Sequence, residues 1–168
     1  MPAHTASFAP SPSLPTILVT GGAGYIGSHT CVELLAAGHP VAVLDNFSNS
    51  SPEVLARVEA LTGQKVRLYQ NDIRDAAVLD HALADSGASA VVHFAGLKAV
   101  GESVEQPLRY YDNNVVGTLR LLEAMARAKV RSLVFSSSAT VYGEPQALPL
   151  TENHPLSATN PYGRSKLV

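Results

Sequence analysis

Charged residues, cysteine and tryptophan are all scarce in this sequence of 168 residues, which has one cysteine and no tryptophan. Charged residues make up 15% of the chain and hydrophobic residues 46%, a composition typical of a globular domain. The 12 basic and 14 acidic residues give a formal charge of −2 and form no basic block, which excludes an electrostatic surface for nucleic acid. Apolar runs are far shorter than a membrane span. The sequence therefore predicts one globular domain that binds neither nucleic acid nor a membrane.

The single cysteine, Cys31, cannot form an internal disulfide. It lies beside Val32 and Leu34 in a predicted helix, so we interpret it as a buried structural thiol and not a reactive one. A reducing compartment, the cytoplasm, is the expected location. The six histidines are scattered without ligand spacing, and we expect no metal site.

Residues 1–15 contain four prolines among serine, alanine and threonine. They have neither the positive region nor the continuous apolar core of a secretory signal. We expect them to form a disordered leader, followed by a folded domain over residues 16–168.

The most informative stretch is an apolar run at 17–20 followed by a cluster of glycines and an apolar helical pattern. Gly22, Gly24 and Gly27 form G-x-G-x-x-G, while Gly21, Gly24 and Gly27 form an overlapping G-x-x-G-x-x-G. Without a Cβ, glycine lets a phosphate approach the free N–H groups of the first helical turn. The positive end of the helix dipole then favours the pyrophosphate of a dinucleotide.

A glycine triplet after a strand is often only a turn, so the motif needs a second element. Dinucleotide sites place a carboxylate about 20 residues further on, at the end of a second strand, where it holds a ribose 2′-hydroxyl. The apolar run 41–44 ends in Asp45 at that position. An ordinary turn residue remains the alternative for Asp45, but the joint match favours a nucleotide site.

Apolar segments with strand and helix periodicity alternate along the whole chain. This alternation predicts an α/β fold, a doubly wound parallel sheet of Rossmann type with strand order 3-2-1-4-5 and ligands at the carboxyl ends of the strands. A loop at 96–106 and an irregular proline-rich segment at 139–159 are expected on that edge, the second covering a substrate. The expected strands are 17–20, 41–45, 66–70, 90–95 and 132–138, and the expected helices are 24–37, 52–61, 77–83, 107–129 and 160–168.

The long helix at 107–129 is predicted from a stripe of apolar residues at helical spacing. The stripe consists of Leu108, Tyr111, Val115, Leu119, Leu122 and Ala126.

Tyr162 and Lys166 lie four residues apart in the last predicted helix, so they share one face of it. A nearby lysine cation favours the phenolate form of a tyrosine, which can then act as a general base. The pair alone would more simply be two surface residues of a helix. Ser138, expected to end a strand on the same edge, adds a hydroxyl that could orient a substrate, and the three together favour catalysis.

These motifs resemble the extended short-chain dehydrogenase/reductase family, and within it the branch of 4-epimerases that act on UDP-hexoses. The resemblance covers residues from about 16 to 168. The strings behind it lie at 20–32, 44–46, 93–104, 110–115, 135–143 and 161–167.

The resemblance implies NAD as the cofactor, since Asp45 would repel the 2′-phosphate of NADP. It implies that Tyr162 is the base, that Lys166 binds the nicotinamide ribose and tunes Tyr162, and that Ser138 contacts the sugar. The implied cofactor contacts are Gly21, Gly24, Tyr25, Ile26 and Gly27 at the pyrophosphate, Asp45, Asn46, Asn49 and Ser50 at the adenosine ribose, Asp72 and Ile73 at the adenine, and Phe94, Ala95, Gly96, Lys98, Asn113, Tyr162 and Lys166 toward the nicotinamide ribose.

The activity that the resemblance implies is the interconversion of UDP-galactose and UDP-glucose, through reversible oxidation at sugar C4. Chains of this family are roughly twice as long, so we expect the sheet to stop before its last strands and the substrate domain to be absent. A homodimer is expected for the full-length enzyme, and for this chain it is in doubt.

Two alternatives remain open. One is an NAD-binding fragment without catalysis, because the helix with Tyr162 and Lys166 is short here. The other is a sugar-nucleotide 4,6-dehydratase, a branch in which an Asp-Glu pair follows the strand-5 hydroxyl. Ala139 and Thr140 stand at those positions, which disfavours it.

Overall fold

The structure is a computed structural model that describes residues 14–168, so the expected leader at 1–15 falls almost wholly outside the described residues. Its five strands form one parallel sheet in the order β3-β2-β1-β4-β5, which confirms the predicted topology. The winding reverses at β1, and the last residue of each strand lies on one edge of the sheet. The strands are β1 (Ile17–Thr20), β2 (Val41–Asp45), β3 (Arg67–Gln70), β4 (Ala90–His93) and β5 (Ser132–Phe135).

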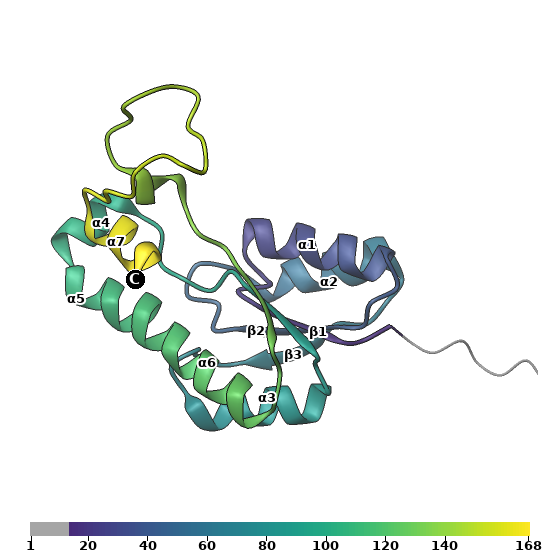
Figure 1. The fold of residues 1–168 in the computed structure, drawn as a ribbon. Coiled ribbons are helices and arrows are strands. Elements are labelled where there is room, and N and C mark those ends of the chain that lie inside the picture. Colours follow the sequence, from purple (N-terminus) through teal and green to yellow (C-terminus); the bar gives the residue numbers. More distant parts are fainter. Residues whose placement is uncertain (1–13) are drawn as a thin grey trace, which may run out of the picture.

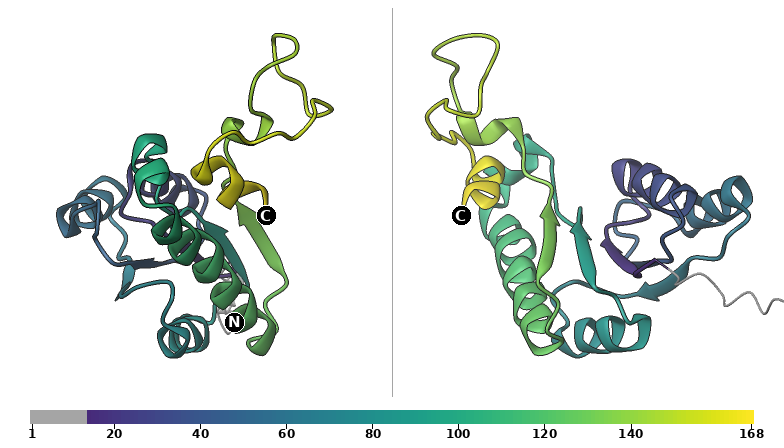
Figure 2. Two further views of the ribbon diagram at one scale, coloured as in Figure 1. Left: turned by 90° about the vertical axis from the view of Figure 1, so that its left-hand side faces the viewer. Right: turned by 45° about the vertical axis from the view of Figure 1, so that its right-hand side comes forward.

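Helices cover both faces of the sheet (Figures 1 and 2). On one side are α1 (Tyr25–Ala36) and α2 (Pro52–Thr62), and on the other are α3 (Ala76–Ser86) and α6 (Gly117–Arg127). Successive strand residues point to opposite faces, so neighbouring residues of β1 enter different cores. Leu18 packs in the core under α3 and α6, while Val19 packs with Cys31 in the core under α1.

Local signals fix the ends of several helices as predicted. Pro52 occupies the first turn of α2, and Gly63 ends that helix in the left-handed conformation with φ of 69°. The Asp75 side chain accepts hydrogen bonds from the backbone N–H groups of Ala77 and Val78, and so caps α3.

The segment expected as a loop at 96–106 contains a short helix, α4 (Val100–Glu105), so that prediction is wrong. Side-chain contacts with α5, the helix that follows, stabilise it. Tyr110 accepts a hydrogen bond from the N–H of Ala99 at 3.0 Å and donates one to Glu102 at 2.8 Å. Such contacts connect α4 to the next helix, and they leave no periodic pattern in the sequence from which α4 could be predicted.

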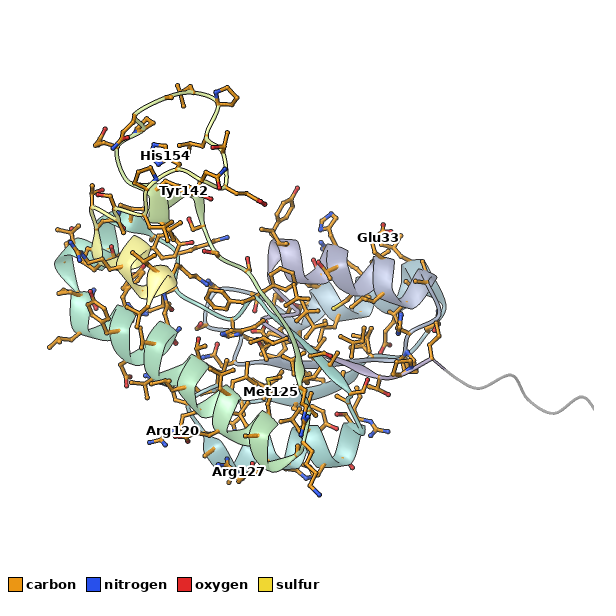
Figure 3. The ribbon with its side chains drawn as sticks, in the orientation of Figure 1. Glu33, Arg120, Met125, Arg127, Tyr142 and His154 are labelled. Carbon is orange, nitrogen blue, oxygen red and sulfur yellow. The ribbon has the colours of Figure 1, made fainter. Side chains whose placement is uncertain are left out.

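The long helix predicted from Pro107 is one helical run in three parts: α5 (Pro107–Tyr110), a π-helical turn η1 (Tyr111–Val116), and α6. Three leucines of the apolar stripe are exposed: Leu108 (81%), Leu119 (53%) and Leu122 (42%). Polar and small residues such as Asn114 and Gly117 share the buried face, and a hydrophobic pattern does not count them. Figure 3 shows α6 with Met125, which is buried, and Arg127, which reaches Asp80 of α3.

Strands β4 and β5 end earlier than expected, at His93 and Phe135 instead of Ala95 and Ser138. Beyond β4 the ladder stops, since the N–H groups of Phe94 and Ala95 both donate to one acceptor, the carbonyl of Thr20.

Ser138 instead caps a 3-10 turn, η2 (Ala139–Tyr142), and accepts a hydrogen bond from the N–H of Thr140. The segment after η2 projects beyond the sheet, where the rings of Tyr142 and His154 meet edge to face with centroids 5.6 Å apart (Figure 3). The last helix is α7 (Pro161–Leu167). Asn160 caps its N-terminus, and the Asn160 side chain accepts a hydrogen bond from the N–H of Gly163. Within residues 14–168, no helix is both long and apolar enough to cross a membrane.

Candidate active site

A cleft of about 520 Å³ opens at the carboxyl edge of the sheet. All but two of the predicted site residues line it, Ser50 and Asp72 being the exceptions. The predicted residues that line the cleft are Gly21, Gly24, Tyr25, Ile26, Gly27, Asp45, Asn46, Asn49, Ile73, Phe94, Ala95, Gly96, Lys98, Asn113, Ser138, Tyr162 and Lys166.

The sequence prediction missed several lining residues that belong to the same strand ends. These are Leu44, Ser48, Asn71, Leu97, Ser136 and Ser137. The available signal was positional: each lies within a few residues of a strand's carboxyl end, where a doubly wound sheet binds ligands.

The glycine turn lines the cleft through the register Gly21, Gly24 and Gly27. Gly21 has φ of +70°, and a Cβ there would lie 2.6 Å from the backbone nitrogen of Ala95. A Cβ on Gly27 would overlap the carbonyl oxygen of Gly21. Gly22, from the other register, faces the core, since its Cβ would strike the side chain of Val43. Glycine at these positions lets β1, β4 and the start of α1 approach closely.

Helix α1 begins in this cleft without a side-chain cap on its N-terminus. The first-turn N–H groups of Tyr25, Ile26 and Gly27 have no partner within the helix, as in any α-helix. The dipole places partial positive charge at the same point. An uncapped helix start in a cleft lined by glycine fits an anionic group such as a pyrophosphate.

Asp45 is 7% exposed and accepts three hydrogen bonds. One oxygen accepts from the N–H of Ala23 at 3.0 Å, and the other accepts from the N–H of Phe47 and the hydroxyl of Ser50, both at 2.9 Å. The carboxylate is therefore fixed against the glycine turn. Ser50, expected among the cofactor contacts, lies outside the cleft lining and holds Asp45 instead.

Asp72 also lies outside the lining, and its carboxylate is engaged by protein groups. Arg74 donates to both of its oxygens at 2.8 Å, and the side-chain amide of Asn46 donates at 3.0 Å. These bonds hold the pKa of Asp72 well below its usual range, with Arg74 the largest cause. Arg74 also pairs with Asp112 of η1 and so links the end of β3 to the long helix.

Lys166 reaches from α7 to the end of β5. Its ammonium group donates to the carbonyl of Ser136 at 3.0 Å and lies 4.8 Å from the centre of the Phe135 ring. A Cβ on Gly96 would lie 3.4 Å from the same nitrogen, so glycine leaves room for it. Burial lowers the pKa of Lys166.

Tyr162 lines the cleft on the same helix, with its ring edge to face against Tyr110 at a centroid distance of 6.5 Å. Helix α7 is anchored from below by Ser165, whose hydroxyl donates to the carbonyl of Tyr162 at 2.7 Å and accepts from Asn114 at 2.9 Å. The position of Tyr162 thus depends on a buried amide of η1.

Asn114 was missed by the sequence prediction, which named its half-buried neighbour Asn113, a residue of the cleft lining. It is 4% exposed and bonds both ways with the backbone of Leu97, accepting from the N–H at 2.8 Å and donating to the carbonyl at 2.9 Å. Together with Ser165, this connects η1, the loop after β4, and α7. Asn114 therefore assembles the part of the cleft next to Lys166.

The sheet order, the glycine turn and the Tyr-x-x-x-Lys helix define a Rossmann-type domain of the short-chain dehydrogenase/reductase kind. A family model described as GDP-mannose 4,6 dehydratase matches residues 18–168, and the chain belongs to that family.

Within the family, curated relatives of this chain include UDP-glucose 4-epimerases, which confirms the resemblance of the motifs. The protein from Bacillus subtilis is 59% identical over 152 residues, covering 90% of this chain and 45% of the relative. The one from Dictyostelium discoideum is 56% identical over 151 residues, covering 90% and 44%. The chain thus spans less than half the length of these relatives.

Solved structures give the same picture. The epimerase from Bifidobacterium longum, in complex with NAD+ and UDP, has a TM-score of 0.89 at 54% identity, over 90% of this chain and 46% of that one. The epimerase from Stenotrophomonas maltophila, with bound NAD and formylated UDP-arabinopyranose, has a TM-score of 0.90 at 48% identity, over 92% and 46%.

Proposed function

We propose that the cleft binds NAD and serves the reversible oxidation of a UDP-hexose at C4, the reaction that interconverts UDP-galactose and UDP-glucose in galactose metabolism. The observation that supports this most strongly is that one cleft unites the glycine turn, Asp45 and the trio of Ser138, Tyr162 and Lys166. Relatives and solved structures named as UDP-glucose 4-epimerases support the choice of reaction.

The cleft fits NAD in two respects. The uncapped start of α1 beside Gly24 suits the pyrophosphate, and Asp45 suits a ribose diol. A 2′-phosphate on that ribose would meet the buried carboxylate of Asp45, so NAD is favoured over NADP. Bound NAD would supply the reversible hydride acceptor that the reaction requires.

The side chains of this chain would orient the sugar and move its proton. In our proposal Tyr162 accepts the proton of the sugar 4-hydroxyl and returns it after the sugar has turned over. Ser138 hydrogen-bonds the sugar, and the Lys166 cation stabilises the phenolate form of Tyr162. Lys166 lines the same cleft as Tyr162, and its ammonium group is held by the carbonyl of Ser136.

A second candidate is NAD binding without catalysis by these 168 residues. The chain covers about 45% of the Bacillus subtilis relative, and the uridine diphosphate site would also need residues from the uncovered part. This favours the second candidate. Dehydration is disfavoured, because Ala139 and Thr140 form the turn after Ser138 where that chemistry needs an acid/base pair.

The proposal includes pairing of two copies through the long helix, supported by the exposed Leu108, Leu119 and Leu122. The cytoplasmic location expected from the cysteine content stays a prediction.

The test is to incubate the purified 168-residue chain, and a longer native form, with NAD and UDP-galactose and to measure UDP-glucose. Turnover by the longer form alone would support the second candidate for this chain and the proposed reaction for the whole protein. Turnover by neither would contradict the proposed reaction.

A further inference from the structure

His93, the last residue of β4, is a buried titratable side chain near the cleft that the proposed chemistry does not use. It is 1% exposed, and both ring nitrogens are bonded. Nδ1 lies 2.6 Å from the hydroxyl of Thr20 on β1, and Nε2 lies 2.9 Å from the hydroxyl of Thr118 on α6. The imidazole therefore bridges the sheet and the helix beneath the cleft.

The bonding of Thr118 determines which nitrogen of His93 has the proton. A threonine hydroxyl has one proton to donate, and Thr118 donates it to the backbone carbonyl of Asn114 at 2.6 Å. Its oxygen can then only accept from His93, so Nε2 is protonated. Nδ1 has no proton and accepts from Thr20, which is fully buried. The hydrogen bonds run in one direction, from Thr20 through His93 and Thr118 to Asn114.

Each end of this chain of bonds adjoins residues that line the cleft. Thr20 directly precedes Gly21, and its carbonyl accepts from the N–H groups of Phe94 and Ala95. Asn114 holds the backbone of Leu97 and, through Ser165, the helix with Tyr162.

We propose that His93 is a positioning residue, fixed as the neutral Nε2–H tautomer, that sets Asn114 relative to β1 and thereby holds the two halves of the cleft together. The role rests on the proposed NAD site, whose pyrophosphate and nicotinamide ends it would keep at a fixed separation.

The surroundings of the imidazole keep it neutral. Burial lowers the pKa of His93 to about 3, and the charge of Lys166 acts in the same direction. Its other neighbours are uncharged: Thr20 from β1, Thr118 from α6, and Phe135 from β5, whose ring centre is 5.6 Å away. A neutral imidazole also adds no repulsion against the ammonium group of Lys166.

The test uses NMR of the 15N-labelled 168-residue chain between pH 5 and 8, where two-bond 1H–15N correlations distinguish a protonated ring nitrogen from a bare one. We expect His93 to stay in the Nε2–H form throughout this range. An imidazole that titrates, or that has its proton on Nδ1, would overturn the proposal.

Two variants of Thr118 test the positioning role. Thr118→Val removes the hydroxyl that joins His93 to Asn114, while Thr118→Ser retains it. We expect only the first to shift the side-chain amide signals of Asn114 and the backbone amide of Leu97, and to weaken NAD binding by about tenfold. Thr20→Val and Thr20→Ser repeat the comparison at the other ring nitrogen, should Thr118→Val fail to fold.

Equal spectra for the valine and serine variants would overturn the positioning role. If the unchanged chain binds no NAD, the proposed function fails, while the tautomer and the amide shifts still decide the role of His93.

Discussion

Lys166 donates a hydrogen bond to the carbonyl of Ser136 at 3.0 Å, so the helix that presents Tyr162 is fastened to the end of β5. The bond brings a cation from the last helix to the carboxyl end of β5, beside β4.

Replacing Lys166 should weaken cofactor binding. Lys166→Met keeps the apolar stem but loses the charge and its bond to the backbone, and we expect the NAD dissociation constant to rise by about tenfold or more. Isothermal titration calorimetry measures it. Arg164→Met on the exposed side of the same helix is the matched control, and an equal effect in both variants would exclude a specific role for Lys166.

Tyr162→Phe should abolish UDP-galactose turnover in any form of the protein that shows it, since the phenol oxygen is the proposed proton acceptor. NAD affinity should change by less than about twofold to threefold, because the ring and its contact with Tyr110 remain. Tyr142→Phe, outside the cleft lining, is the control. Retained turnover in Tyr162→Phe would refute its role as the base.

Gly27→Ala should destabilise the fold by about 1–3 kcal/mol or more, because the added methyl group would overlap the carbonyl of Gly21. Urea unfolding followed by circular dichroism measures the free energy of unfolding. Gly101→Ala is the control, since a Cβ there meets no atom within 4 Å. A neutral Gly27→Ala would mean that α1 does not start as closely against β1 as described.

The stability of the fold should decrease as the pH is lowered from 6.5 to about 4.5. In this range the unfolded chain takes up a proton at His93, whose ordinary pKa is 6.5, while the folded protein accepts it only near pH 3. The free energy of unfolding should then drop by up to about 1.4 kcal/mol per pH unit. The carboxylates with lowered pKa values, such as Asp72, act in the same direction but below this range. Urea unfolding of His93→Gln at several pH values should show a free energy of unfolding that depends less steeply on pH. An unchanged dependence on pH would contradict the buried, neutral state of His93.

The sequence was sufficient to predict the sheet order and most of the cleft because their signals are local. Gly21, Gly24 and Asp45 stand at spacings that a βαβ unit imposes on any dinucleotide site. The roles of His93 and Asn114 could not be predicted in this way, since each depends on partners 17 to 73 residues distant.

The buried face of the long helix does not follow from the apolar spacing, for a related reason. A polar amide at Asn114 and a glycine at Gly117 face inward there, while leucines at 108, 119 and 122 face outward. Burial on this helix follows the hydrogen bonds of the site and the close approach of Ile73, not hydrophobicity alone.

The most direct test of the central claim, that this cleft is an NAD site whose ribose is recognised by Asp45, is calorimetric titration of the chain and of Asp45→Asn with NAD and NADP. We expect the unchanged chain to bind one NAD and to prefer it over NADP by at least about tenfold, with the preference lost in Asp45→Asn. Absence of NAD binding, or a preference that survives Asp45→Asn, would contradict the account.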